Sequence, residues 1–111
     1  MLKGKTALIT GGTRGIGFAI AENFAKNGAD VMITYVGNDA AAEAAKTKLE
    51  AFGGRVLVSK GDVADGEYAE SAIATMTSEL GKIDILVNNA GITADKLLLR
   101  MSSDEFMKVI N

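Results

Sequence analysis

The sequence predicts an α/β fold in which helices flank a parallel sheet. Short apolar runs, typical of buried strands, alternate with longer stretches that have helical periodicity. A glycine-rich loop joins the first apolar run to the first helical stretch. Alternating strands and helices are connected by right-handed crossovers, which make the sheet parallel. We expect one domain over residues 1–111, because a chain of this length buries enough surface for a single core.

Four strands and four helices are expected in alternation along the chain. Lys5–Thr10 is the first predicted strand, and Ile16, Ile20 and Phe24 have the spacing of a helix that ends near Gly28. The remaining strands and helices are predicted, in order, at Val31–Val36, Ala40–Phe52, Arg55–Ser59, Glu67–Leu80, Ile83–Val87 and, after a loop, Ser102–Asn111.

Capping residues mark several of these helix ends. Asp65 is the predicted N-cap of the third helix, and Gly81 its stop. Gly53-Gly54 ends the second helix, and Ser102-x-x-Glu105 is typical of the capping box of a last helix.

The glycine-rich loop indicates phosphate binding. Three glycines, Gly11, Gly15 and Gly17, bring the backbone of the loop to the first turn of a helix, where N–H groups and the helix dipole favour an anion. Phe18 follows the last glycine, so the lysine and hydroxyl of an ATP-binding P-loop are absent. We therefore expect a dinucleotide, the alternative being a plain tight turn.

Composition mainly excludes functions. The chain has no cysteine and no histidine, which excludes disulfides, thiol chemistry and histidine-based catalysis, and we predict no metal site. A net charge of −2 gives no electrostatic footprint for nucleic acid. Without a secretion leader or an apolar run of membrane-spanning length, the expected location is cytoplasmic.

Three motifs in the expected order resemble the short-chain dehydrogenase/reductase family. Thr10–Gly17 matches T-G-x-x-x-G-x-G, Gly61-Asp62-Val63 follows the third strand, and Asn88–Gly91 follows the fourth as N-N-A-G. Residues Gly91–Met101 are similar to bacterial 3-oxoacyl-[acyl-carrier-protein] reductases within that family. The resemblance implies a Rossmann-like sheet of strand order 3-2-1-4, with the cofactor at the carboxyl ends of the strands.

The resemblance also implies an activity and a cofactor. It implies NADPH-dependent reduction, in fatty-acid synthesis, of a 3-oxoacyl thioester bound to an acyl-carrier protein. A sugar or small ketone as substrate, or a nucleotide-binding or folding fragment without chemistry, remain alternatives. NADP is preferred over NAD, because none of the residues from Tyr35 to Asn38, at the end of the second strand, is acidic. Arg14 in the glycine loop also offers a cation to the 2′-phosphate of NADP.

The predicted cofactor-binding residues are Gly11, Thr13, Arg14, Gly15, Ile16, Gly17, Tyr35, Asn38, Asp62, Val63, Asn89, Ala90 and Gly91. In the family the Asp62 carboxylate would accept from the adenine amino group, although an Asp in this place can instead cap a turn. Asn88 is expected to be structural and to tie neighbouring strands together. Arg14 could alternatively be a solvated loop residue.

No catalytic residue is predicted in this chain. The family's proton donor is a tyrosine with a lysine four residues later, but Tyr35 is followed by Asp39 and Tyr68 by Ala72 at that spacing. We therefore expect an amino-terminal part of a longer reductase, inactive alone. Its fourth strand would become an open edge, so we expect a homodimer or higher oligomer through that edge or through exchange of the last helix.

Overall fold

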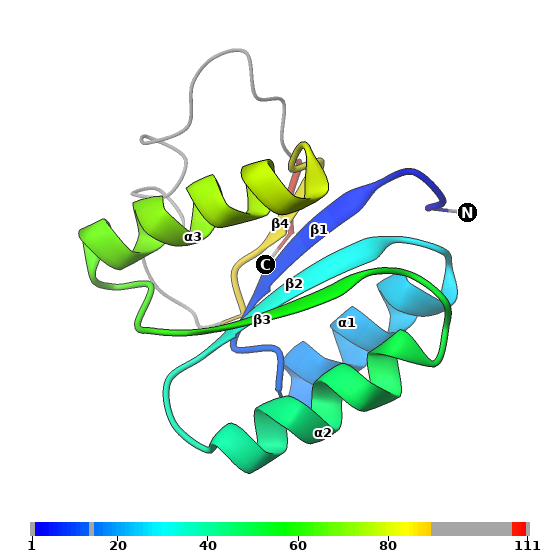
Figure 1. The fold of residues 1–111 in the computed structure, drawn as a ribbon, viewed down its shortest axis with the longest axis horizontal. Helices are drawn as coiled ribbons and strands as arrows, with labels where there is room; N and C mark the ends of the chain where they lie inside the picture. Colours follow the sequence, from blue (N-terminus) through cyan, green and yellow to red (C-terminus); the bar gives the residue numbers. More distant parts are fainter. Residues whose placement is uncertain (1, 14, 90–107, 111) are drawn as a thin grey trace.

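The fold is a five-stranded parallel sheet with helices on both faces, seen here in a computed structural model that describes residues 2–13, 15–89 and 108–110 (Figure 1). The strand order is β3-β2-β1-β4-β5, which contains the predicted order 3-2-1-4. The strands are β1 (Thr6–Thr10), β2 (Asp30–Tyr35), β3 (Val56–Lys60), β4 (Ile85–Val87) and β5 (Lys108–Ile110). The helices are α1 (Gly15–Lys26), α2 (Asp39–Glu50) and α3 (Gly66–Leu80).

The sheet is buried on both faces, and successive side chains of β1 pack into hydrophobic clusters on opposite faces of the sheet. Ala7 and Ile9 pack with the buried residues of α1 and α2, whereas Leu8 packs with those of α3. Figure 1 shows the same division, with α1 and α2 on one face and α3 on the other. Because neither face of β1 meets water, its three central residues, Ala7-Leu8-Ile9, form a continuous apolar run rather than an alternating pattern.

The caps expected for α3 are confirmed. The Asp65 carboxylate accepts from the backbone N–H of Glu67 at 3.0 Å and lies 3.5 Å from the N–H of Tyr68. Gly81 ends the helix with φ +88°, a conformation that favours glycine. At α2, Asn38 is the N-cap, because its side-chain oxygen accepts from the N–H of Ala41 at 3.0 Å.

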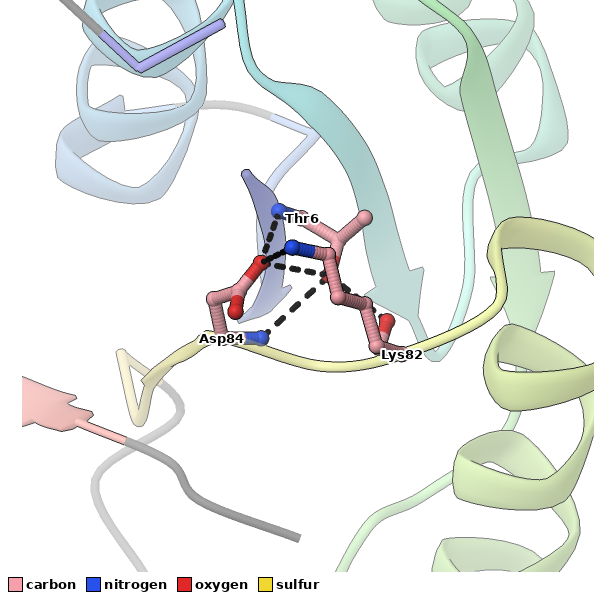
Figure 2. A network of polar contacts seen from close by, with 3 residues as sticks. All are labelled: Thr6, Lys82 and Asp84. Atoms are coloured by element: carbon pink, nitrogen blue, oxygen red, sulfur yellow. Dashed lines mark hydrogen bonds and ion pairs between the residues drawn. The ribbon is translucent and has the colours of Figure 1, made fainter. Parts of the chain in front are cut away.

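A polar network joins β1 to the segment before β4 at the amino end of the sheet (Figure 2). The Asp84 carboxylate accepts from the backbone N–H of Thr6 at 2.9 Å and pairs with the Lys82 ammonium at 3.1 Å. The Thr6 hydroxyl donates to the Lys82 carbonyl at 2.6 Å. Burial alone would raise the pKa of Asp84, but the Thr6 hydrogen bond and the Lys82 charge outweigh it and hold that pKa below its usual value.

The predicted last helix is wrong where the structure describes it. Lys108–Ile110 form β5, parallel to β4, with Val109 in register with Leu86. The rest of that segment, including the Ser102-x-x-Glu105 capping box, lies outside the described residues. The capping box is a local signal, whereas the open backbone groups of β4 are satisfied by a strand that is distant in sequence.

The presence of β5 removes the open β4 edge, which was one of the two predicted routes to an oligomer. β4 pairs with β1 on one side and with β5 on the other, so it is not an edge strand. Because both sides of β4 are paired, this strand has no open edge through which a dimer could form. Among the residues that the structure describes, no helix is both long and apolar enough to cross a membrane.

Candidate cofactor-binding site

The glycine-rich loop is fixed to the end of β2. Gly11 N–H donates to the Thr34 hydroxyl at 3.3 Å, and Gly12 N–H donates to the Thr34 carbonyl at 3.2 Å. Gly12 packs directly on β2, since a Cβ at this position would lie 2.5 Å from Ile33 Cγ2. Gly11 and Gly15 have φ values of +67° and +63°, which other residues rarely adopt. The loop is therefore held close to the sheet by contacts that require glycine.

The first turn of α1 meets the loop and the end of β4 at Gly17. A Cβ at Gly17 would overlap the Gly11 carbonyl oxygen and lie 2.5 Å from Asn89 Nδ2. The Asn89 amide donates to the same Gly11 carbonyl at 3.1 Å. The described parts of two predicted motifs, the glycines of the loop and Asn89 of N-N-A-G, are thus brought together at the carboxyl end of the sheet.

Asn88 has the structural role expected from the sequence. Its side chain is buried, and its Oδ1 lies 3.3 Å from the hydroxyl oxygen of Thr10 in β1. The same hydroxyl is 3.4 Å from the carbonyl oxygen of Val87 and can donate to either acceptor. Asn88 therefore links β4 to the neighbouring strand, through a side chain of β1 rather than through its backbone.

A charged cluster occupies the carboxyl ends of β2 and β3. Tyr35 and Lys60 are register partners, and both reach Asp39 in the first turn of α2. The Tyr35 hydroxyl donates to Asp39 Oδ1 at 2.9 Å, and the Lys60 ammonium lies 3.4 Å from each carboxylate oxygen. The hydrogen bond to Asp39 raises the pKa of Tyr35, and the same bond, followed by the Lys60 charge, lowers the pKa of Asp39.

This cluster corrects one step of the sequence argument for NADP. The prediction counted no carboxylate at Tyr35 to Asn38, but Asp39 stands one residue further on and is hydrogen-bonded to Tyr35. Asn38 is occupied as the N-cap of α2. A carboxylate is thus present at this edge, and a lysine partly neutralises it.

Asp62 caps a turn at the end of β3, as the alternative interpretation held. Its Oδ1 accepts from the N–H of Ala64 at 2.9 Å. Its Oδ2 makes no hydrogen bond to the described residues, which leaves an acceptor on an exposed side chain. The neighbouring Val63 is buried, so its side chain belongs to the core and only its backbone can face a ligand.

Tyr68 supports this turn and was not singled out by the sequence analysis. Its partly buried ring packs on Gly61, where any Cβ would overlap ring carbons. Its hydroxyl and that of Ser59 are 2.5 Å apart. Burial raises the pKa of Tyr68, and the bond with Ser59 opposes that rise. The sequence signal that could have identified Tyr68 is its place as an aromatic residue in the first turn of the helix that follows Gly61-Asp62-Val63.

The carboxyl edge of the sheet thus brings together predicted residues from all four predicted strands. Gly11, Tyr35, Asp62 and Asn89 follow or end β1, β2, β3 and β4. Thr13 is partly exposed in the loop, and Ile16 is exposed on the first turn of α1. Three other predicted residues, Arg14, Ala90 and Gly91, lie outside the described residues. A ligand at this edge would sit where chain connections diverge from β1 to opposite sides of the sheet.

Comparisons with known proteins agree with this arrangement. The pattern of the short chain dehydrogenase family matches residues 5–111. A 3-oxoacyl-[acyl-carrier-protein] reductase FabG of Chlamydia trachomatis is 44% identical over 111 residues, which are 100% of this chain and 45% of that protein. An L-rhamnose 1-dehydrogenase (NAD(P)(+)) of a Sphingomonas species is 42% identical over 104 residues, 94% of this chain and 41% of that protein.

A solved structure adds a ligand to the comparison. The short chain dehydrogenase of Burkholderia cenocepacia, crystallised in complex with NADP, has a TM-score of 0.78 and 42% identity, and the match covers 94% of this chain and 42% of that one. The chain spans less than half the length of these relatives. Since the family pattern matches almost all of its residues, the chain belongs to the short chain dehydrogenase family.

Proposed function

We propose that these residues form the NADP(H)-binding part of a short-chain ketoreductase. The observation that supports this most directly is the contact of buried Gly17 with Gly11 and Asn89, which leaves no room for a Cβ and brings the first turn of α1 against the glycine loop and the end of β4. Such a turn is suited to a pyrophosphate, because its N–H groups have no intrahelical partner. NADP bound to the similar Burkholderia dehydrogenase supports the identity of the ligand.

Different residues of the chain would bind different parts of the dinucleotide. The loop backbone and the start of α1 would hold the pyrophosphate, and Asp62 Oδ2 is the free acceptor for an adenine amino group. Asn89, with Ala90 and Gly91, would line the side of the ribose and nicotinamide. When bound, NADPH supplies the hydride that is transferred to a carbonyl carbon.

The proposed substrate is a 3-oxoacyl thioester on an acyl-carrier protein, which would be reduced to the 3-hydroxyacyl form in fatty-acid synthesis. The similarity to the Chlamydia reductase over the full chain supports this choice. The reduction also needs a proton donor at the carbonyl oxygen. Neither tyrosine of this chain has a lysine four residues later, so we propose that the 111 residues alone do not catalyse it.

A sugar reductase is the second candidate, and the similarity to an L-rhamnose dehydrogenase favours it. A nucleotide-binding or folding fragment without chemistry is the third. The cytoplasmic location and the formation of an oligomer stay predictions.

Calorimetry with NADPH, NADP and NAD tests the binding proposal. We expect NADP to bind more tightly than NAD. If none of the three nucleotides binds, the proposal is contradicted. NADPH consumption with an acetoacetyl thioester and with a sugar lactone tests the chemistry. Turnover of about 1 per second, an ordinary enzymatic rate, would show that the chain contains a proton donor that we have not recognised.

A further inference from the structure

The cluster of Tyr35, Asp39 and Lys60 lies where a dinucleotide fold distinguishes a ribose 2′-hydroxyl from a 2′-phosphate. In such folds an acidic residue about 20 positions after the glycine motif accepts from the 2′-hydroxyl. Asp39 follows Gly17 by 22 positions and is the first residue of α2, four positions after β2 ends at Tyr35. Alone, it would attract the hydroxyl of NAD and repel the phosphate of NADP.

Lys60 changes this balance. It is the last residue of β3, in register with Tyr35, and its ammonium lies 3.4 Å from both Asp39 oxygens. The side chains of Lys60 and Asp39 are 55% and 69% exposed, so solvent screens the pair and an incoming dianion can compete for the ammonium. The Tyr35 hydroxyl donates to Asp39 Oδ1 at 2.9 Å through a hydrogen bond that does not involve Lys60.

We propose that Lys60 and Asp39 together set the choice between NADP and NAD. Lys60 is a cation for the adenosine 2′-phosphate in addition to Arg14, and the Tyr35 hydroxyl keeps its hydrogen bond to the Asp39 carboxylate when Lys60 contacts the phosphate. Without Lys60, Asp39 is the unopposed acceptor for a 2′-hydroxyl. This inference rests on the proposed function, since it requires that the adenosine end of a dinucleotide binds at this edge.

The test compares the binding of two probes, 2′,5′-ADP and 5′-AMP, which differ by the 2′-phosphate. Calorimetry on the 111-residue chain gives the ratio of their dissociation constants. For Lys60→Met we expect the preference for 2′,5′-ADP to fall by about fivefold, the loss of one ion pair at an exposed site. Lys60→Arg retains the charge and should retain the preference. Asp39→Asn removes the repulsion and should increase the preference by roughly threefold.

Lys82→Met is the matched control. Lys82 is also paired with a carboxylate and is similarly exposed, at 52%, but it lies at the amino end of the sheet. Its substitution should leave the ratio unchanged. Circular dichroism of each variant confirms that the fold is retained.

Two failures can be told apart. If the unmodified chain binds neither probe, the proposed function is wrong. If it prefers 2′,5′-ADP and Lys60→Met keeps that preference, the inference about Lys60 is wrong. An unchanged ratio in Asp39→Asn would equally overturn the role given to Asp39.

Discussion

Replacing Gly17 with alanine should destabilise the fold and remove nucleotide binding, because the added methyl group has no room. The new Cβ would overlap the Gly11 carbonyl oxygen, and it would lie 2.5 Å from Asn89 Nδ2 and 3.0 Å from the Gly11 carbonyl carbon. Two of these three atoms belong to the backbone of a loop that is itself anchored to Thr34. Rotation of a side chain therefore cannot relieve the overlap.

Opposing effects determine the magnitude. Alanine favours a helix over glycine by about 0.5–1 kcal/mol, which by itself would stabilise α1. Overpacking against a fixed neighbour costs about 1–3 kcal/mol. Displacing Asn89 from the Gly11 carbonyl adds the loss of one hydrogen bond, about 0.5–1.5 kcal/mol. We expect a net loss of about 2 kcal/mol in the free energy of unfolding.

Urea denaturation followed by circular dichroism measures this loss, and calorimetry with 2′,5′-ADP measures binding. Gly37→Ala is the matched control, because a Cβ at Gly37 would meet no heavy atom within 4 Å and its φ lies outside the left-handed region. We expect that control to stay within about 0.5 kcal/mol of the unmodified chain. If Gly17→Ala equals Gly37→Ala in stability and binds 2′,5′-ADP normally, the contact seen at Gly17 does not shape the site.

Three further predictions concern single side chains. The pKa of Asp84 is held low in the folded chain, so its carboxylate contributes to the free energy of unfolding above the ordinary pKa of about 4. This contribution is lost as the pH falls through the lower pKa of the folded state. In urea titrations across this pH range, the free energy of unfolding of Asp84→Asn should therefore decline less than that of the unmodified chain. Arg14→Ala should cost about 1.5–3 kcal/mol in calorimetric binding of NADP and little for NAD, and an equal loss for both would exclude contact with the 2′-phosphate. Tyr68→Phe leaves Ser59 without its hydroxyl partner and should lower the free energy of unfolding by about 1 kcal/mol in urea, whereas an unchanged midpoint would mean that water replaces the bond.

The main elements of this fold could be predicted because their signals are local. The buried strand β1 has an apolar run, Ala7-Leu8-Ile9, at its centre, and α3 is bounded by an Asp that caps its first turn and a glycine that ends it. The predicted boundaries differ from the observed ones by one or two residues at most ends, as for β3, predicted at Arg55–Ser59 and observed at Val56–Lys60. Sheet order followed from the family resemblance and from the rule for crossovers.

The prediction for the end of the chain failed because the deciding interaction is not local. Ser102-x-x-Glu105 has the sequence of a capping box, but Lys108–Ile110 pair with β4 through a ladder between residues more than twenty positions apart. Val109 and Ile110 are β-branched and favour a strand once a partner is available. That partner becomes evident only when β4 is placed beside β1.

The charge balance at the end of β2 was misjudged for a related reason. Counting residues along the chain from Tyr35 to Asn38 overlooks Lys60, which lies 25 positions further on but directly across the sheet. In a parallel sheet the carboxyl ends of adjacent strands face the same ligand, so the charges of both strands act on it. The predicted order already placed the second and third strands side by side, and comparing their last residues would have revealed a lysine opposite the tyrosine. Cofactor preference in such a fold is therefore better judged from pairs of strand ends than from the second strand alone.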